Sequence, residues 1–101
     1  MKKIINGKLY NTETATGLAR YSNDGGWRDF SHFVETLYRK KTGEFFLHGD
    51  GGGMTRYAAI EQDGRTRGEK IFPLTEAEAK DWMEKYATVD EYVAVFGEPE
   101  E

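Results

Sequence analysis

The chain has 101 residues, which is the length of one small domain, and we treat residues 1–101 as a single unit. Hydrophobic residues make up only 38% of it, but 14% of the residues are aromatic, so the composition predicts a thin, ring-rich core rather than disorder. The absence of cysteine excludes a disulfide framework, a thiolate nucleophile and a cysteine-ligated metal centre.

The net charge of −4 is unevenly distributed along the chain. Residues 1–72 carry 12 Lys and Arg against 9 Asp and Glu, whereas residues 73–101 carry 2 against 9. A mildly basic, hairpin-rich sheet region over residues 1–72 is therefore followed by an acidic helical tail over residues 73–97. Such a separation of charge bears on the partners that a protein meets.

The start of the chain and the length of its apolar stretches indicate the expected cellular compartment. Lys2 and Lys3 are followed by no long apolar run, so we expect no signal peptide. The longest apolar stretches are a few residues, so we expect no membrane-spanning segment. Because so small a domain lacks disulfides, we expect a cytoplasmic protein.

The strongest local signal is a β-hairpin over residues 3–10. Asn6-Gly7 between apolar residues favours a type I′ turn, which places Ile4 opposite Leu9 and Lys3 opposite Tyr10. Residues 11–22 are ambiguous, and the spacing of Ala15, Leu18 and Ala19 favours a short helical turn, or a strand exit with a one-turn helix.

A loop is expected over residues 23–26. Trp27 and Phe30, which follow it, form either a lid over the core or an exposed contact pair, and we favour the lid.

A second hairpin over residues 34–48 organises the chain, with Gly43 in its loop and Lys40 paired with Glu44. In this register Leu37, Leu47, Arg39 and Phe45 share one face, and the other face carries Thr36, Tyr38, Phe46 and His48. Both faces carry aromatic rings, so we expect one to cover a core and the other to meet further protein.

The glycine-rich segment 49–55 has no Gly-Lys-Ser/Thr ending and no helix after it, so a loop or bulge is favoured over a phosphate cradle. We expect a strand over residues 54–60, a loop over 61–69, and a short strand over 70–72 that Pro73 ends or holds at a sheet edge.

Two helices are predicted after Pro73. Thr75 with Glu78, and Thr88 with Glu91, have the spacing of capping boxes, and Gly97 is a helix stop. The first helix has an apolar face that we expect to pack on the sheet, formed by Ala79, Trp82, Met83 and Tyr86. The second helix has an apolar face of its own, formed by Val89, Tyr92, Val93 and Phe96.

Catalytic and metal-binding signals are weak. No second ligand stands at metal-binding spacing from His32 or His48, and no serine lies in a nucleophile context. His48, beside the glycine segment, has the chemistry of a ligand or base, but a structural histidine on a sheet face is favoured. We expect no enzyme, no metal and no cofactor.

Two binding hypotheses remain. In the first, carboxylates of the acidic tail imitate phosphates and occupy a basic groove of a partner; these are Glu78, Asp81, Glu84, Asp90 and Glu91. In the second, a basic and aromatic sheet face binds RNA or single-stranded DNA through Arg39, Lys40, Lys41, Arg56, Arg65 and Arg67. The sequence pI of about 5.2 argues against the second.

Several segments together resemble a known family: residues 1–15, 35–39, 46–49 and 73–75, with Glu78, Ala79, Trp82 and the ending 96–98. They are similar to small proteins carried on phages, plasmids and conjugative elements of Firmicutes, to which inhibitors of type II CRISPR nucleases have been assigned. The family supplies no catalytic residues, and segments 50–55 and 61–69 depart most from its pattern.

The resemblance implies inhibition by binding. Such nucleases hold nucleic acid in a strongly positive channel, which suits the acidic tail. We therefore expect a small α+β protein with an antiparallel sheet of four to six strands and one or two C-terminal helices on one face. The expected partner is a CRISPR effector nuclease, with or without guide RNA, and the alternative is an RNA- or DNA-binding accessory protein of a mobile element.

Overall fold

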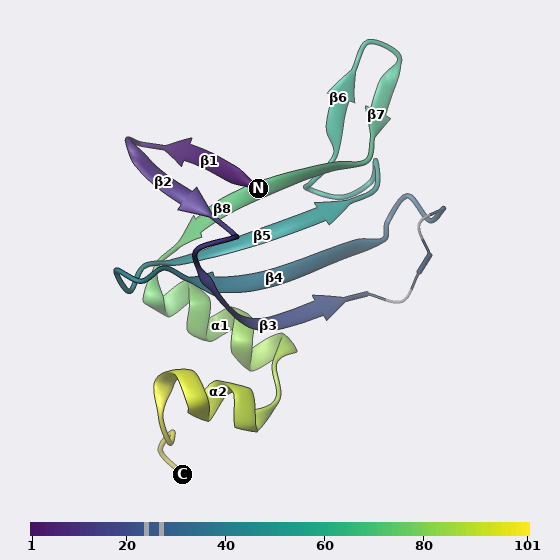
Figure 1. Cartoon of the computed structure of the whole chain (residues 1–101). Helices are drawn as coiled ribbons and strands as arrows, with labels where there is room; N and C mark the ends of the chain where they lie inside the picture. The colour runs from purple at the N-terminus through teal and green to yellow at the C-terminus, as the bar shows by residue number, and fades with distance from the viewer. Residues whose placement is uncertain (24, 27) are drawn as a thin grey trace.

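The computed structural model describes residues 1–23, 25, 26 and 28–101. Its centre is an antiparallel sheet with the strand order β3-β4-β5-β8, formed by β3 (Thr16–Ser22), β4 (Phe33–Arg39), β5 (Phe45–Gly51) and β8 (Gly68–Leu74) (Figure 1). Two separate hairpins pair β1 (Lys2–Ile5) with β2 (Lys8–Asn11), and β6 (Ala59–Glu61) with β7 (Gly64–Thr66). The chain ends in α1 (Glu76–Tyr86) and α2 (Val89–Phe96).

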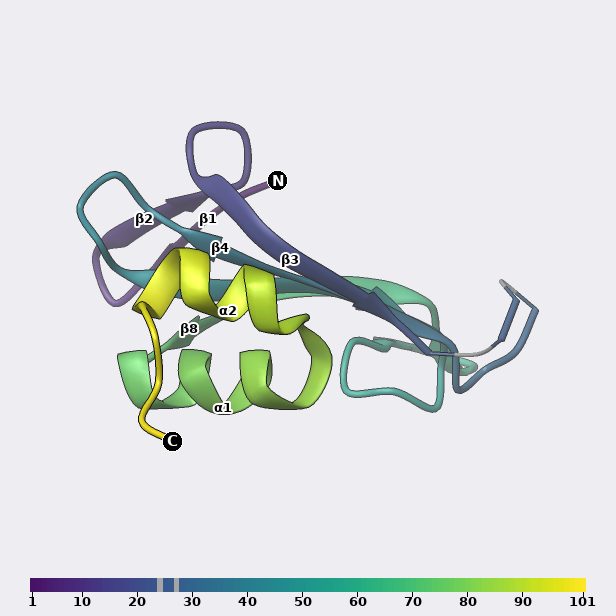
Figure 2. The same ribbon diagram turned by 90° about the horizontal axis from the view of Figure 1, so that it is seen from below.

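The helices cover one face of the sheet. Figure 2, turned from Figure 1, shows α1 and α2 side by side across it. Leu37, Phe45 and Leu47 of the sheet share a core cluster with Trp82 and Met83 of α1. An antiparallel sheet with two C-terminal helices on one face confirms the predicted α+β fold.

The opposite face of the sheet is covered in part by the N-terminal hairpin. Phe46 and Ile71 form a second buried cluster with Tyr10 of β2, and the Tyr10 and Phe46 rings meet edge to face at 5.5 Å. The second ring-bearing face predicted for the central hairpin therefore meets the chain's own first hairpin. The sheet is stabilised by apolar burial on both sides.

Both predicted hairpins have the expected registers. Ile4 pairs with Leu9 and Lys3 with Tyr10, and positive φ values of 52° at Asn6 and 77° at Gly7 fit a type I′ turn. In the central hairpin Leu37 pairs with Leu47. The Lys40 amide donates to the Glu44 carbonyl at 2.8 Å.

The helical turn predicted within residues 11–22 is wrong, because this segment turns over residues 12–15 and then forms the seven-residue strand β3. A β-bulge lies between Gly17 and Ala19. The extra residue lets Leu18 and Ala19, which are adjacent in sequence, both join the helix-side core. The bulge therefore imitates a helical spacing of apolar residues.

The prediction for segments 54–60 and 61–69 is also partly wrong. The segment from Met54 to Ala58 is a loop held by turn hydrogen bonds, and strand β6 begins only at Ala59. The expected loop instead forms β7 and the start of β8. Pro73 lies in β8, which is an edge strand, as predicted.

Strand β5 extends through Gly51 into the glycine-rich segment. A Cβ atom built on Gly49 would lie 2.3 Å from Cζ of Tyr57, so the Tyr57 ring rests directly on the backbone of β5. The need for glycine here is close packing within the chain. Phe30 is 68% exposed, so the lid prediction is wrong for Phe30, and Trp27 lies outside the described residues.

Both helices begin with the predicted capping boxes. The Thr75 hydroxyl accepts from the Glu78 amide at 3.1 Å, and the Glu78 carboxylate accepts from the Thr75 amide at 2.9 Å. Thr88 and Glu91 repeat this exchange, and Gly97 caps α2 with a φ of 84°. Val89, predicted on the apolar face of the second helix, is 76% exposed. Within the described residues, neither helix has the length and apolar character needed to cross a bilayer.

Candidate functional site

A groove of about 550 Å³ lies between α1 and the strand ends of the sheet. One wall comes from α1 and consists of Glu78, Asp81, Trp82, Lys85 and Tyr86. The other comes from β4 and the loop after β5, and includes Glu35, Met54, Arg56 and Tyr57. Aromatic rings and charged groups from distant parts of the chain therefore meet in one open hollow, which has the composition of a binding site.

The carboxylate of Glu35 lies at the base of this groove and is only 6% exposed. It accepts hydrogen bonds from the Trp82 indole at 2.9 Å, the Tyr57 hydroxyl at 2.5 Å and the Arg56 guanidinium at 3.1 Å. A buried carboxylate without such donors would be strongly destabilising. Glu35 therefore ties β4, the loop after β5 and α1 into one unit.

The protonation of this cluster follows from its packing. Burial raises the pKa of the Tyr57 phenol well above its ordinary value, and the hydrogen bond to Glu35 raises it further. Partial burial lowers the pKa of Arg56, but the hydrogen bonds and charges of Tyr57 and Glu35 outweigh burial, and the net shift is upward. Both side chains therefore stay protonated and act as donors to Glu35.

Sequence reasoning missed the role of Glu35. The available signal was the period of two in the central hairpin, which places Glu35 on the same face as Leu37 and Leu47. An acid on a core-facing position indicates a buried carboxylate with partners from elsewhere. Which partners those are could not be read from the sequence.

The predicted partner-binding acids have different surroundings. Glu78 and Asp81 line the groove, whereas Glu84 lines a second hollow of about 470 Å³ between α1 and α2. Asp90 and Glu91 lie in the first turn of α2. Glu78 and Glu91 serve as capping residues, and bonds from the Thr75 backbone and hydroxyl lower the pKa of Glu78.

The other three acids are not part of a capping box. Asp81, Glu84 and Asp90 are exposed, and within the described part of the chain no hydrogen bond or ion pair holds their carboxylates. Free carboxylates on an outer helix surface are available to a partner, which capping carboxylates are not.

The alternative basic residues fall into two groups. Arg39, Lys40 and Lys41 lie at the β4–β5 turn, and Arg56, Arg65 and Arg67 lie at the opposite end of the sheet, about 20 Å away along a seven-residue strand. Arg65 donates to the Gly53 carbonyl at 2.8 Å, and Arg67 donates to Asp50 at 2.6 Å. The structure does not bring the six residues together as one continuous nucleic-acid surface.

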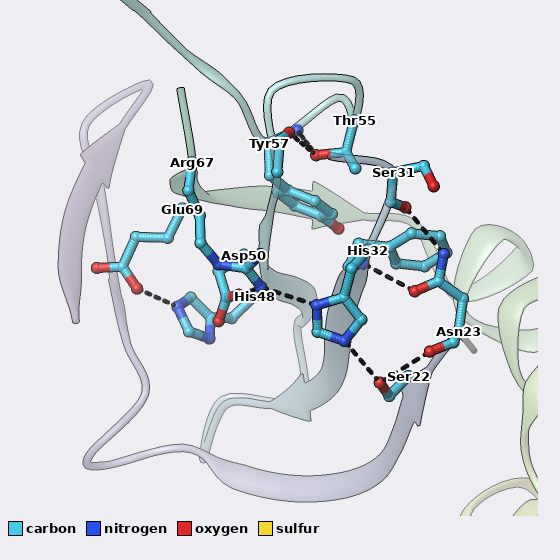
Figure 3. Close-up of polar contacts among 12 residues, drawn as sticks. Ser22, Asn23, Ser31, His32, His48, Asp50, Thr55, Tyr57, Arg67 and Glu69 are labelled. Atoms are coloured by element: carbon cyan, nitrogen blue, oxygen red, sulfur yellow. Dashed lines mark hydrogen bonds and ion pairs between the residues drawn. The ribbon is translucent and has the colours of Figure 1, made fainter. Parts of the chain in front are cut away.

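The two histidines have different contacts (Figure 3). His32 is buried, with Nδ1 3.1 Å from the Arg67 guanidinium and Nε2 3.2 Å from the Ser22 hydroxyl. Because arginine can only donate, Nδ1 must accept, and Nε2 therefore carries the proton. A general base for Ser22 would need the opposite tautomer, so the Ser22–His32 contact is a structural hydrogen bond.

His48 lies on the sheet face, 3.1 Å from the Glu69 carboxylate on the neighbouring strand. Among the described residues, no group of three or more potential ligands is arranged to hold a metal ion. Neither histidine lines the groove of about 550 Å³ described above.

Exposed apolar side chains lie next to the groove. Phe30 is 68% exposed and Met54 is 76% exposed, and the Met54 amide donates to the Phe30 carbonyl at 2.8 Å. Met54 also lines the groove. Large exposed apolar side chains beside a groove are typical of a protein-binding surface.

Comparison of the chain with protein families, curated proteins and solved structures finds no match.

Proposed function

We propose that this chain acts by binding rather than by catalysis, as an inhibitor of a type II RNA-guided nuclease in the cytoplasm of a bacterial host. It would cover a surface that the nuclease needs for guide loading or for target entry. The target class comes from the resemblance of the chain to small mobile-element proteins, and the binding surface comes from the groove.

One observation carries the proposal. Glu78 and Asp81 from the acidic tail line the same groove as Trp82, Tyr86 and the exposed Met54. Aromatic residues and methionine are enriched in protein interfaces, and negative charge suits a partner with a basic channel. The histidines and Glu35, by contrast, are held by contacts within the chain.

Co-purification tests the proposal directly. Tagged protein is incubated with a type II nuclease, with and without guide RNA, and the complex is separated by gel filtration. A stable complex in at least one state, together with loss of target cleavage at a stoichiometric ratio, is the expected result. A nuclease that elutes alone and cleaves normally in both states contradicts the proposal.

Charge reversal then tests the surface. Glu78 is unsuitable, because its replacement would also break the capping box of α1, in which its carboxylate accepts from the Thr75 amide. The triple variant Asp81→Lys, Glu84→Lys, Asp90→Lys changes only acids outside the capping boxes, and inhibition should be lost. The control reverses the same number of charges in the exposed C-terminal tail through Glu98→Lys, Glu100→Lys and Glu101→Lys, and should inhibit normally.

If both triple variants inhibit equally well, the acids of the helices are not the contact surface. Filter binding to single-stranded RNA at two salt concentrations addresses the alternative. Salt-sensitive binding to free RNA would favour the basic residues of the sheet over the acidic helices.

A further inference from the structure

The groove already shows how it can hold an arginine. The guanidinium of Arg56 is bonded to Glu35 and lies 4.5 Å above the ring of Phe72 and 5.3 Å from the ring of Tyr57. A carboxylate beside an aromatic face is the environment that a guanidinium prefers, because it combines planar hydrogen bonding with stacking.

The α1 wall also combines a carboxylate with aromatic rings, and part of the Tyr86 ring is open to a partner. Trp82 and Tyr86 are one helical turn apart, with ring centroids at 5.4 Å, and Tyr86 is 37% exposed. The Tyr86 ring packs against the Tyr21 ring, with the centroids 4.2 Å apart and the ring planes tilted by 31°. Asp81 lies beside Trp82 on the same wall.

The charges of the groove favour a cation near Asp81. Arg56 compensates Glu35, and Glu78 keeps its negative charge while it caps α1. Asp81 has no hydrogen bond or ion pair with any described residue. Lys85 lies one helical turn beyond Asp81, so the charged groups in the first half of the α1 wall are the carboxylates of Glu78 and Asp81.

We propose that this groove receives an arginine side chain of the partner protein, with the guanidinium paired to Asp81 and packed against the exposed part of the Tyr86 ring. The inference rests on the proposed function, because it names the chemistry by which the partner is recognised. A protein that holds nucleic acid in a positive channel presents arginines on its surface, and arginine is enriched at the centre of interfaces. The stem of the arginine would lie along Met54.

A first experiment examines the groove without any nuclease. The ¹⁵N-labelled protein is titrated with the peptide Ac-Gly-Arg-Gly-NH₂, and with the same peptide carrying lysine or citrulline. The indole N–H signal of Trp82, assigned by means of Trp27→Phe, is followed by NMR. The arginine peptide should give saturable shifts at millimolar concentration, the lysine peptide weaker ones, and the neutral citrulline peptide none.

Two variants identify the carboxylate responsible. Asp81→Asn should abolish the response to the arginine peptide. Glu84→Gln removes the same charge from the same helix but lines the hollow between α1 and α2, and should respond like the parent chain. No response to arginine, equal responses to arginine and citrulline, or equal responses of the two variants would overturn the inference.

A second experiment uses the nuclease complex. Asp81→Asn should weaken binding at least about tenfold, whereas the control Glu100→Gln, which removes one charge from the exposed C-terminal tail, should change it less than about threefold. If the nuclease binds both variants equally, the arginine site is refuted and the inhibitor function stands. If the nuclease never binds the parent chain, the function fails, and the peptide titration still decides the chemistry of the groove.

Discussion

Replacement of Glu35 by glutamine should destabilise the protein more than any other exchange of a carboxylate for an amide in the groove. Glu35 presents two oxygens to three donors, from Trp82, Tyr57 and Arg56. Glutamine keeps one oxygen and places an N–H₂ group at the position of the other. In either orientation, a donor of the new side chain therefore meets a donor of the protein.

The size of the effect follows from these contacts. A hydrogen bond to a charged group contributes about 1.5–3 kcal/mol, and one or two of the buried bonds are lost, so we expect a destabilisation of about 2–4 kcal/mol. Arg56 adds little, because its side chain is 55% exposed and water replaces the lost partner. For a domain of this size the loss corresponds to a decrease in Tm of roughly 8–30 °C.

Urea unfolding followed by circular dichroism at pH 7 measures this loss, and the m-value should not change. The matched control is Glu69→Gln, which makes the same chemical change at an exposed carboxylate paired with His48. The control should lose less than about 1 kcal/mol. If Glu35→Gln is no more destabilising than Glu69→Gln, Glu35 does not hold α1 and the loop after β5 together.

Further predictions concern the packing and the caps. Gly49→Ala places a Cβ 2.3 Å from the Tyr57 ring and should lower the free energy of unfolding, measured in urea, by about 1–3 kcal/mol. The control Gly26→Ala meets open space and should lower it by less than about 0.5 kcal/mol. Equal losses in the two variants would refute the close approach of Tyr57 to Gly49. Tyr57→Phe should destabilise the parent chain more than it destabilises the Glu35→Gln variant, because the Tyr57 hydroxyl donates a hydrogen bond to Glu35 in the parent chain. If the two losses of stability add up in the double variant, Tyr57 and Glu35 are not coupled. The pKa of Glu78 is lowered by the Thr75 amide and hydroxyl, so its contribution to stability is present above the unfolded pKa and is lost as pH falls through the folded value. Urea midpoints of the parent chain and of Glu78→Gln should therefore differ at pH 7 and converge below about pH 4, and a difference that does not depend on pH would show that the charge of Glu78 is not what stabilises the cap.

The bulge in β3 explains why one strand was misassigned. Leu18 and Ala19 both contact the helix-side core only because the bulge between Gly17 and Ala19 adds a residue to the strand. Without knowledge of the pairing with β4, adjacent apolar residues fit a helical period better than a strand period. The loop before β6 was misassigned for a similar reason, since Tyr57 is buried by packing on Gly49 of another strand and not by strand pairing of its own.

In the candidate groove, too, some features follow from local sequence patterns and others from contacts between distant segments. The helical spacing of Glu78, Asp81 and Glu84 predicts one acidic face, but Glu84 lines the hollow between α1 and α2, and only Glu78 and Asp81 line the groove. Its base was not anticipated, because the partners of Glu35 lie 21, 22 and 47 residues away along the chain. The separation of the basic residues into two groups also depends on which strand ends lie together, and no local pattern contains that information.

By itself, the sequence determined the elements whose stabilising contacts lie within a few residues. These are the Asn6-Gly7 turn, the central hairpin, the two capping boxes and the stop at Gly97. Only the tertiary structure decided which carboxylate is buried, which acids are free and which rings meet in a groove. The physical reason is that burial and long-range hydrogen bonds depend on which distant segments pack together, whereas turns and caps depend on backbone conformations and donors that neighbouring residues supply.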